Sequence, residues 1–399
     1  MSAPGGLPTL PSVSKISNHV TRILGQNPGK FTLQGTNTYL IHHPSSPSLI
    51  LLDTAQGVPS YLPLLRGSIQ SHPVQPCHLT DIILSHYHLD HTDGLRSVLA
   101  ELGKIGAIGK NGVRVWKYKC SREDEDGKDA DIERQLEGLD ESLIDTDGMR
   151  YGESLTSDGS KGGKIRVLRN GQIFEIKSAN ESDDERVELE VVHTPGHTSD
   201  SISLLLRDGS GCRGDSASSA TTTKDHAALF SFDTVLGHGT AVFSSLSTYL
   251  ESLTSLISLL SPTSDASGTK AQDAAVPIYP GHGAVIEDGI AKLKEYKQHR
   301  LDRESQVIEA LKGRRSELVT ATSLTNSIYG NSIPESLKPA ATRGLLLHLE
   351  KLVLDGRVSR HDQAKEDTAD TPVDWDKLGV SAKDIPAGWD DKWSWVGSD

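Results

Sequence analysis

Short apolar runs and alternating segments predict a series of β-strands along the first three quarters of the chain. Residues 36–41 alternate between two faces, which is the period of a half-buried strand. The run Ile82-Ile83-Leu84 is continuous instead, and it predicts a buried strand that ends at Ser85. Further strands are predicted at 48–53, 113–118, 172–176, 187–192, 201–206, 227–232 and 276–279.

Apolar residues also recur at the spacing of helices between and after these strands. Leu95, Val98, Leu99 and Leu102 share one face of a helix that follows the strand at 82–84. Other helices are predicted around 61–69 and 244–260, and then in close succession at 290–312, 318–328 and 334–354. The last three helices precede Gly356 and a short strand, which is the pattern of a small winged-helix-like module.

The order of elements and the charge distribution divide the chain into an α/β domain and a smaller module. Residues 121–150 hold 12 Asp and Glu against 4 Lys and Arg, so we expect a solvated insertion there. Residues 291–360 have the opposite balance, with 13 Lys and Arg against 8 Asp and Glu. The predicted parts are a flexible lead-in at 1–15, the main domain at 16–290 with an acidic insertion at about 121–165, the module at 291–360, and a polar tail at 361–399. The tail contains Trp375, Trp389 and Trp393. These rings either attach it to the folded body or leave it loose.

The overall composition is typical of a globular protein and limits its partners. Three widely spaced cysteines, Cys77, Cys120 and Cys212, form neither a disulfide framework nor a zinc ribbon, so we expect a reducing, cytoplasmic compartment. The start of the chain has no signal-peptide pattern and no apolar run is long enough to span a bilayer, so no membrane partner is expected. The net charge of −13 disfavours general nucleic-acid binding, which needs clustered Lys and Arg.

The segment 85–94, SHYHLDHTDG, places four metal-ligand residue types in the loop between a strand and a helix. Residues two apart in an extended segment point the same way, so His86 and His88 can reach one metal ion together. Asp90 and His91, at the turn into the helix, can face a second ion beside it. Imidazole and carboxylate donors suit zinc, with manganese or iron as alternatives. An ordinary surface loop explains one isolated histidine better than it explains this spacing.

Three later residues also lie where an apolar strand ends. His197 is in the turn after the strand at 187–192, and Asp233 and His282 directly follow two further strands. Residues at strand ends on one edge of a sheet converge in space even when they are far apart in the sequence. The predicted metal ligands are therefore His86, His88 and His197 for one ion with an open fourth position, Asp90, His91 and His282 for its neighbour, and Asp233 as a bridge between the two.

These motifs resemble those of the metallo-β-lactamase superfamily of binuclear zinc hydrolases, whose first motif is HxHxDH and whose later motifs hold single His, Asp and His residues. The stretches NPGKFTLQGTNTYLI, HTPGHTSDS, LGHGTAVF and IYPGHG look more narrowly like the lactamase-like protein 2 branch. That branch contains animal endoribonucleases and fungal lactamase-like thioesterases of polyketide gene clusters. The resemblance covers roughly residues 16–300 and implies an αββα sandwich that holds two Zn²⁺ ions at one sheet edge, with a winged-helix-like C-terminal module.

The chain departs from the family pattern at two positions beside the predicted ligands. Asp93-Gly94 stands where the family usually has Gly-Gly, and Phe232 stands where a glycine usually precedes the bridging aspartate. Glycine serves where backbones crowd together. Phe232 is therefore expected to shift the loop that carries Asp233 and to affect the geometry of the bridge.

The chemistry of the leaving group favours a thioester substrate. A hydroxide held by two zinc ions is the expected nucleophile, and Asp90 is the candidate for orienting it and passing a proton. A departing thiolate needs little acid assistance, whereas an RNA phosphodiester benefits from a dedicated acid, for which His193 is the one weak candidate. A structural or surface role is the simpler interpretation of His193 and of His238.

The predicted function is therefore hydrolysis of a small acyl thioester by a metal-dependent thioesterase. The resemblance implies release of a polyketide chain from the acyl-carrier protein domain of a polyketide synthase in a fungus. One alternative is a metal-dependent single-strand endoribonuclease, in which case nucleic acid is the partner and the basic module assists binding. The other alternative is a non-catalytic metal-binding scaffold, which has no physical need for seven ligands.

Overall fold

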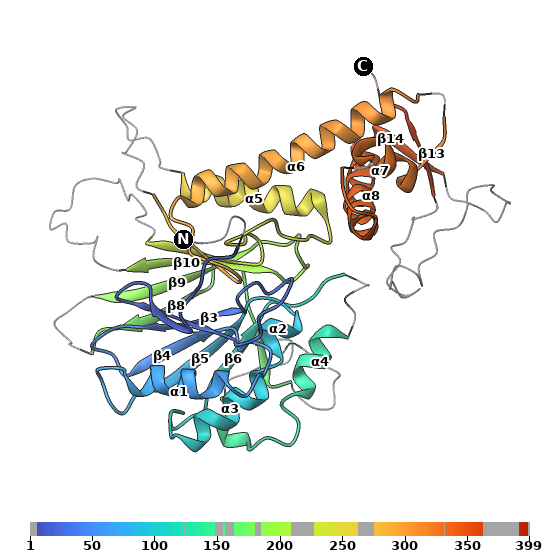
Figure 1. The fold of residues 1–399 in the computed structure, drawn as a ribbon. Helices are drawn as coiled ribbons and strands as arrows, with labels where there is room; N and C mark the ends of the chain where they lie inside the picture. The colour runs from blue at the N-terminus through green and yellow to red at the C-terminus, as the bar shows by residue number, and fades with distance from the viewer. Residues whose placement is uncertain are drawn as a thin grey trace, which may run out of the picture. The chain divides into compact units, whose positions relative to one another are not determined.

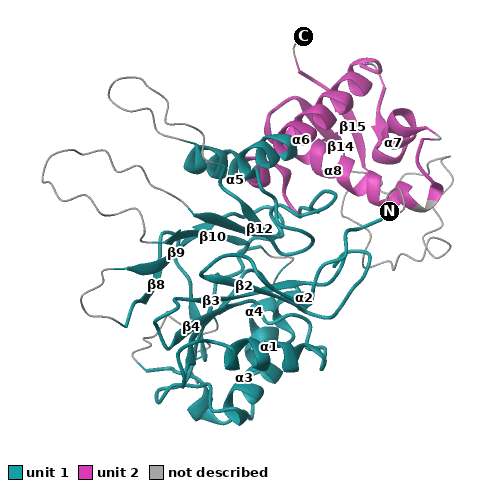
Figure 2. Cartoon of the chain, turned by 60° about the vertical axis from the view of Figure 1, so that its left-hand side comes forward, with its two compact units in different colours: residues 1–243, 251–296 teal, residues 244–250, 297–399 magenta. Residues whose placement is uncertain are grey.

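The computed structural model of the chain resolves two compact units, which Figure 2 shows in different colours. Unit 1 comprises residues 1–243 and 251–296, and unit 2 comprises residues 244–250 and 297–399. The residues that the structure describes are 6–122, 125, 127–147, 155, 163–179, 185–208, 227–261, 275–315, 317–330, 332–361 and 391–397.

Two stacked β-sheets form the centre of unit 1 (Figure 1). Within the described ranges, the first sheet has the strand order β1-β2-β3-β4-β5-β6-β7, and its strands from β4 to β7 pair in parallel. These strands are β1 (Val13–Lys15), β2 (Val20–Leu24), β3 (Asn37–His42), β4 (Ser48–Leu52), β5 (His78–Leu84), β6 (Arg114–Lys117) and β7 (Ile165–Val167).

The second sheet has the order β12-β11-β10-β9-β8, in which β11 and β12 pair in parallel and the other neighbours pair antiparallel. Its strands are β8 (Ile173–Lys177), β9 (Arg186–His193), β10 (Ile202–Asp208), β11 (Ala228–Phe232) and β12 (Ile278–Pro280). Because β4 pairs in parallel with β5, and β11 with β12, the carboxyl ends of each pair open at the same edge of their sheet.

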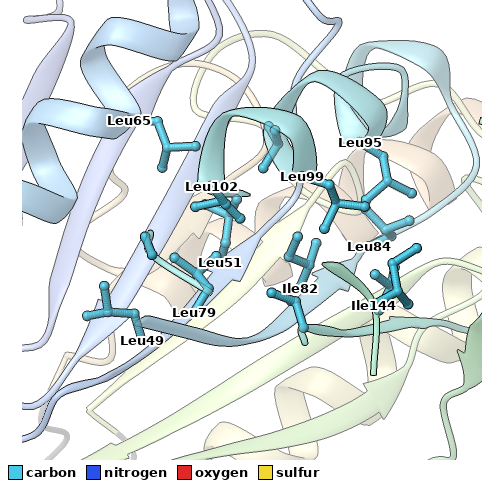
Figure 3. Close-up of a cluster of buried hydrophobic side chains, with 14 of the residues drawn as sticks. Leu49, Leu51, Leu65, Leu79, Ile82, Leu84, Leu95, Leu99, Leu102 and Ile144 are labelled. Atoms are coloured by element: carbon cyan, nitrogen blue, oxygen red, sulfur yellow. The ribbon is translucent and has the colours of Figure 1, made fainter. Parts of the chain in front are cut away.

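Alternating side chains of the central strands explain why the two sheets stack and why helices cover the first one. Leu49 and Leu51 of β4 pack into the cluster between the first sheet and its helices, which Figure 3 shows, whereas Ile50 and Leu52 pack into the cluster between the sheets. The helices on this side are α1 (Tyr61–Gln70), the short α2 (Leu89–Thr92), α3 (Leu95–Lys104) and α4 (Lys128–Arg134), with the 3₁₀ turn η2 (Glu141–Leu143).

The part of helix α5 (Leu246–Leu260) from residue 251 onward and the first part of α6 (Gly289–Lys312), both in unit 1, lie over the outer face of the second sheet (Figure 1). The four layers are therefore helix, sheet, sheet and helix, and the αββα sandwich predicted from the sequence is confirmed. Among the described helices, none combines the length and the hydropathy that crossing a bilayer requires.

The acidic segment is less detached than its composition predicts. Helix α4 lies inside it, and Ile132, Leu136 and Ile144 are buried in the core between the first sheet and its helices. Strand β7 then adds to the first sheet. The expectation of a solvated insertion is therefore wrong for the described part, because a few apolar side chains anchor the segment despite its many exposed carboxylates.

Unit 2 combines helices with a small sheet of the order β13-β15-β14 within the described residues. The strand β15 comes from the tail that we separated from the module, and its Trp393 and Trp395 are buried in the core of unit 2. The tail is therefore pinned at this strand, whereas Trp375 and Trp389 lie outside the described residues. The remaining elements are α7 (Ala321–Tyr329), η4 (Glu335–Leu337), α8 (Lys338–Leu354), β13 (Val319–Thr320), β14 (Val358–His361) and β15 (Lys392–Trp395).

Candidate metal centre

Three predicted histidine ligands and Asp233 meet at one edge of the two sheets. The Nδ1 atom of His88 lies 3.0 Å from Nε2 of His86 and 3.0 Å from Nε2 of His197. The Oδ2 atom of Asp233 is 3.6 Å from Nε2 of His197 and 4.0 Å from Nε2 of His86. One donor atom from each of the four residues lies within 4.8 Å of all the others, a spacing that can hold a metal ion.

The other three predicted ligands form a second group that shares Asp233 with the first. The Oδ2 atom of Asp90 is 3.1 Å from Nε2 of His282 and 3.4 Å from Nε2 of His91. The Oδ1 atom of Asp233 lies 3.4 Å from the Nε2 atoms of both histidines. The two oxygens of Asp233 thus face the two groups separately, as a bridging carboxylate would. All seven residues predicted from the sequence lie together.

A carboxylate that the sequence analysis did not single out fixes the orientation of two of these histidines. Asp53 follows β4 and is fully buried, with a backbone φ of 59°. Its Oδ2 atom is 2.7 Å from Nδ1 of His91 and accepts a hydrogen bond from the Ser85 hydroxyl, which contacts Nδ1 of His86. Because Ser85 gives its only proton to Asp53, it accepts the Nδ1 proton of His86. A neutral ring at either position therefore directs its Nε2 lone pair inward.

Backbone contacts fix the other two sides of the centre. Nδ1 of His197 lies 2.7 Å from the carbonyl oxygen of Val242, so that ring also directs its Nε2 lone pair inward. The buried Asn37 amide donates to the carbonyl oxygens of Pro280 and Gly283 on either side of His282. Asn37 is the first residue of β3. The structure gives it the role of holding the turn that carries His282.

The donor set fits a pair of divalent cations. His86 and His197 both direct an Nε2 lone pair at Nδ1 of His88, which carries at most one proton and can donate it to only one of them. A metal ion between the rings would accept one lone pair from each of the three histidines. Burial, followed by the effect of His197, lowers the pKa of His88 to about 3, so this imidazole is neutral and available as a ligand at pH 7. Nitrogen and carboxylate oxygen in this combination are the ligands of catalytic zinc sites.

The group around Asp90 has a different charge balance. Burial lowers the pKa of His282, but Asp233 and Asp90 outweigh this effect and raise the value to about 9. Burial likewise raises the pKa of Asp90, but the nearby His91 and His282 bring it well below its usual range. Asp90 and Asp233 therefore favour positive charge next to them. Protonated imidazoles can supply that charge, or a metal cation can replace the protons.

The two departures from the family pattern are accommodated by the backbone. Phe232 has a φ of 44°, in the left-handed region that bulky residues rarely adopt, while its ring is buried and stacks with Phe230 at 6.3 Å. Phe232 thus takes the conformation of a glycine, and Asp233 still reaches both ligand groups. Asp93 has an ordinary φ of −70°, whereas a Cβ at Gly94 would lie 1.9 Å from the carbonyl oxygen of Thr54.

The two additional histidines considered in the sequence lie outside this cluster. The Nε2 atom of His193 is 2.8 Å from the carbonyl oxygen of Ser199, and its ring stacks on Tyr118 with the centroids 3.9 Å apart. Burial lowers the pKa of His193, so it stays neutral at pH 7 and uses its Nε2 proton within the fold. His238 is exposed. Neither residue is in the ligand groups, in agreement with the structural or surface role favoured by the sequence.

The site and fold define a class of protein, and comparison with known proteins gives the same one. Residues 31–261 match the model of the Metallo-beta-lactamase superfamily, and residues 320–367 match the Beta-lactamase associated winged helix domain. The first match covers more than half of the chain, so this protein belongs to the metallo-β-lactamase superfamily, whose members are typically metal-dependent hydrolases.

Curated relatives narrow the position of the chain within the superfamily. It is 31% identical to the Beta-lactamase-like protein 2 homolog of Drosophila melanogaster over 359 residues, which is 90% of this chain and 96% of that protein. It is also 31% identical to the Lactamase-like protein adaB of Aspergillus niger over 363 residues, which is 88% of this chain and 86% of that protein.

Solved structures share the fold at much lower sequence identity. A Beta-lactamase domain protein from Burkholderia ambifaria superposes with a TM-score of 0.59 at 17% identity, covering 97% of this chain and 95% of that one. A metallo-beta-lactamase family protein from Thermus thermophilus gives a TM-score of 0.51 at 18% identity, covering 87% of this chain and 97% of that one.

Proposed function

We propose that this protein is a binuclear zinc hydrolase that cleaves thioesters and releases an acyl or polyketide chain from an acyl-carrier protein. The observation that carries the proposal is the convergence of seven donor side chains around the bridging position of Asp233. In this proposal His86, His88 and His197 hold one zinc ion, Asp90, His91 and His282 hold the other, and Asp233 gives one carboxylate oxygen to each.

The chemistry divides between the metal ions and the side chains that hold them. When bound, the ions lower the pKa of a water molecule to near neutrality and neutralise negative charge that develops on the substrate oxygen. Asp90 accepts a hydrogen bond from the Thr36 hydroxyl at 3.3 Å while the same oxygen faces His282. Held in this way, Asp90 is the candidate for orienting the attacking water and accepting its proton.

The surroundings of the centre support a substrate with a good leaving group. His193, the one weak candidate for a general acid, contacts the Ser199 carbonyl group through Nε2 and belongs to neither ligand group. A thiolate leaves without protonation, because its conjugate acid is far stronger than an alcohol. Thioester cleavage therefore requires nothing more from the protein than water activation and stabilisation of the developing oxyanion.

The carrier-protein partner is proposed from the likeness to fungal lactamase-like proteins, with which this chain aligns over most of its length. The direct test is hydrolysis of an acyl-N-acetylcysteamine thioester by the full chain, before and after removal of metal with a chelator. We expect turnover that is lost on chelation and restored by zinc. A metal-loaded protein that never cleaves the thioester would reject the thioesterase proposal, and a protein that retains no metal would favour the scaffold.

A single-strand endoribonuclease is the second candidate, favoured by the basic residues of unit 2. Arg357 and Lys312 lie 5.2 Å and 5.6 Å from the ring of Trp395, and Arg360 lies 5.6 Å from that of Trp393. Both rings are buried, so these positive charges could contact the phosphates of a single strand, but the rings could not stack on its bases. Cleavage of a single-stranded RNA that requires the same metal, without thioester turnover, would replace the first proposal by this one.

A further inference from the structure

The three-histidine group is assembled from both sheets of the sandwich. His86 and His88 follow β5 in the first sheet, whereas His197 lies in the turn between β9 and β10 in the second. The separation of the two sheets at this edge therefore sets the distance between the imidazoles. One backbone hydrogen bond, from the N–H of Ile202 to the carbonyl oxygen of Ser85 at 3.1 Å, already joins the sheets there.

A buried ion pair joins the sheets at the same edge. Lys117 ends β6 and pairs in register with Leu84, the last residue of β5, so its side chain starts beside the segment that carries His86. Its Nζ atom lies 2.6 Å from Oδ2 of Asp200, three residues after His197, and both side chains are fully buried. Burial lowers the pKa of Lys117, but Asp200 and Asp129 outweigh it and keep the ammonium group charged.

The acidic segment supplies two further contacts to this cluster. Asp129 lies at 2.8 Å from the Lys117 Nζ atom and also accepts a hydrogen bond from the N–H of Cys120. Glu125, which is 2% exposed, accepts hydrogen bonds from the backbone N–H and the hydroxyl of Ser199. The segment therefore holds the backbone two residues after His197 as well as the lysine that pairs with Asp200.

We propose that this cluster of contacts, which we call the latch, positions His197 for metal binding. The latch consists of Lys117, Asp200, Asp129, Glu125 and Ser199. Through it, the acidic segment contributes to the geometry of the three-histidine group. The latch residues are positioning residues and contact no substrate. The inference rests on the proposed metal centre. It predicts an asymmetry, because His282 and its neighbours depend on Asn37 and Asp53 and receive no contact from the latch among the described residues.

The test measures zinc affinity in two backgrounds, each of which keeps one ligand group. His282→Ala disables the group around Asp90, and His88→Ala disables the three-histidine group. Asp129→Asn keeps the shape of the side chain while removing its charge, so the fold is preserved. Competition with a chromophoric chelator should show zinc binding weakened about 10–100-fold by Asp129→Asn in the His282→Ala background and unchanged in the His88→Ala background.

A second ion pair with a buried carboxylate in the same unit provides the control. Glu101 is 3% exposed and accepts a hydrogen bond from Arg66 at 2.6 Å, between helices α1 and α3. Glu101→Gln should leave both zinc affinities unchanged. Equal weakening of both groups by Asp129→Asn, or no weakening of either, would overturn the latch. Failure of the unsubstituted protein to bind zinc would instead reject the metal centre itself. Glu125→Gln is a second, independent variant, and it should weaken zinc binding in the same background as Asp129→Asn.

Discussion

Two clusters of buried histidines lie at opposite ends of the first sheet, and they differ in what surrounds the rings. The candidate metal centre follows the carboxyl ends of β4 and β5, whereas His42 ends the antiparallel β3 and pairs with Leu49 near the start of β4. At that end the rings of His42 and His72 lie 5.4 Å apart, and those of His19 and His43 lie 5.6 Å apart.

The two clusters differ in the carboxylates close to their rings, with Asp53, Asp90 and Asp233 near His91 but Glu185 at 4.0 Å from Nε2 of His43. Asp53, Asp90 and Asp233 surround His91, and together they outweigh burial and raise its pKa. For His42, burial lowers the pKa to about 4, and His72, His19, Lys15 and His43 lower it in the same direction. The group around Asp90 thus attracts positive charge, whereas burial lowers the pKa of His42 and, in the three-histidine group, that of His88. The carboxylates distinguish the group around Asp90 from both.

Substituting one histidine in each cluster should give the largest contrast. His88→Ala removes a donor that faces both His86 and His197, and we expect hydrolysis to fall more than about 100-fold, since loss of an outer partner alone costs 10–100-fold. His42→Gln should retain full activity and metal content. Thioester turnover and elemental analysis of the two proteins measure this difference. Equal activity in both would contradict the assignment of the ligands.

The carboxylate behind the metal centre should give the next largest effect. Asp53→Asn removes the charge that orients His91 directly and His86 through Ser85. Zinc affinity should fall about 10–100-fold while the circular-dichroism spectrum stays unchanged. Unaltered affinity would mean that packing alone orients the rings.

Metal removal should lower the thermal stability of the protein only when the predicted metal ligands are intact. A ligand that binds only the folded state, present at a free concentration of 100 times its Kd, stabilises that state by about 2.7 kcal/mol. Saturating zinc should therefore raise the midpoint of thermal unfolding of the apo-protein, and by the same amount in His42→Gln. The increase should be smaller in His88→Ala. An equal increase in all three proteins would place the zinc elsewhere.

Mild acid should produce the smallest effect, and part of it should act through the cluster around His42. His42 has a folded pKa of about 4 against an ordinary value of 6.5, so between these values the unfolded chain binds a proton that the folded chain does not. Stability contributed by the neutral ring is thus present above pH 6.5 and is lost as the pH falls toward 4. Urea unfolding of metal-free protein at pH 7 and pH 5 should show less loss in His42→Gln than in the unsubstituted chain.

The sequence was sufficient to predict the layers and the convergence of seven donor side chains, because both depend on local signals. Apolar runs mark the strands, and each predicted ligand lies within a few residues of a strand end. The role of Asp53 was missed because it depends on the parallel pairing of β4 with β5 and on a left-handed backbone. A strand ending in aspartate was visible, but its partner lay 38 residues further on.

The acidic segment and the tail could not be predicted because their few decisive contacts are distant in sequence. Average composition hides Ile132, which is buried against the first sheet and its helices, and Asp129, which pairs with Lys117. Likewise, β15 depends on pairing with β13 and β14, whose residues lie more than 30 positions away, and on the burial of Trp393 and Trp395. The numbers of acidic and basic residues describe the surface of such segments and do not reveal the few buried side chains that attach them to the fold.

The most direct measurement of the central claim is the zinc-to-protein ratio of the full chain after exhaustive dialysis against metal-free buffer, together with that of His282→Ala. Two groups that share Asp233 predict a ratio of two, which falls to one when His282 is removed while His86, His88 and His197 remain. A ratio that stays below one in the unsubstituted protein, or that is unchanged by His282→Ala, would contradict the paired metal centre.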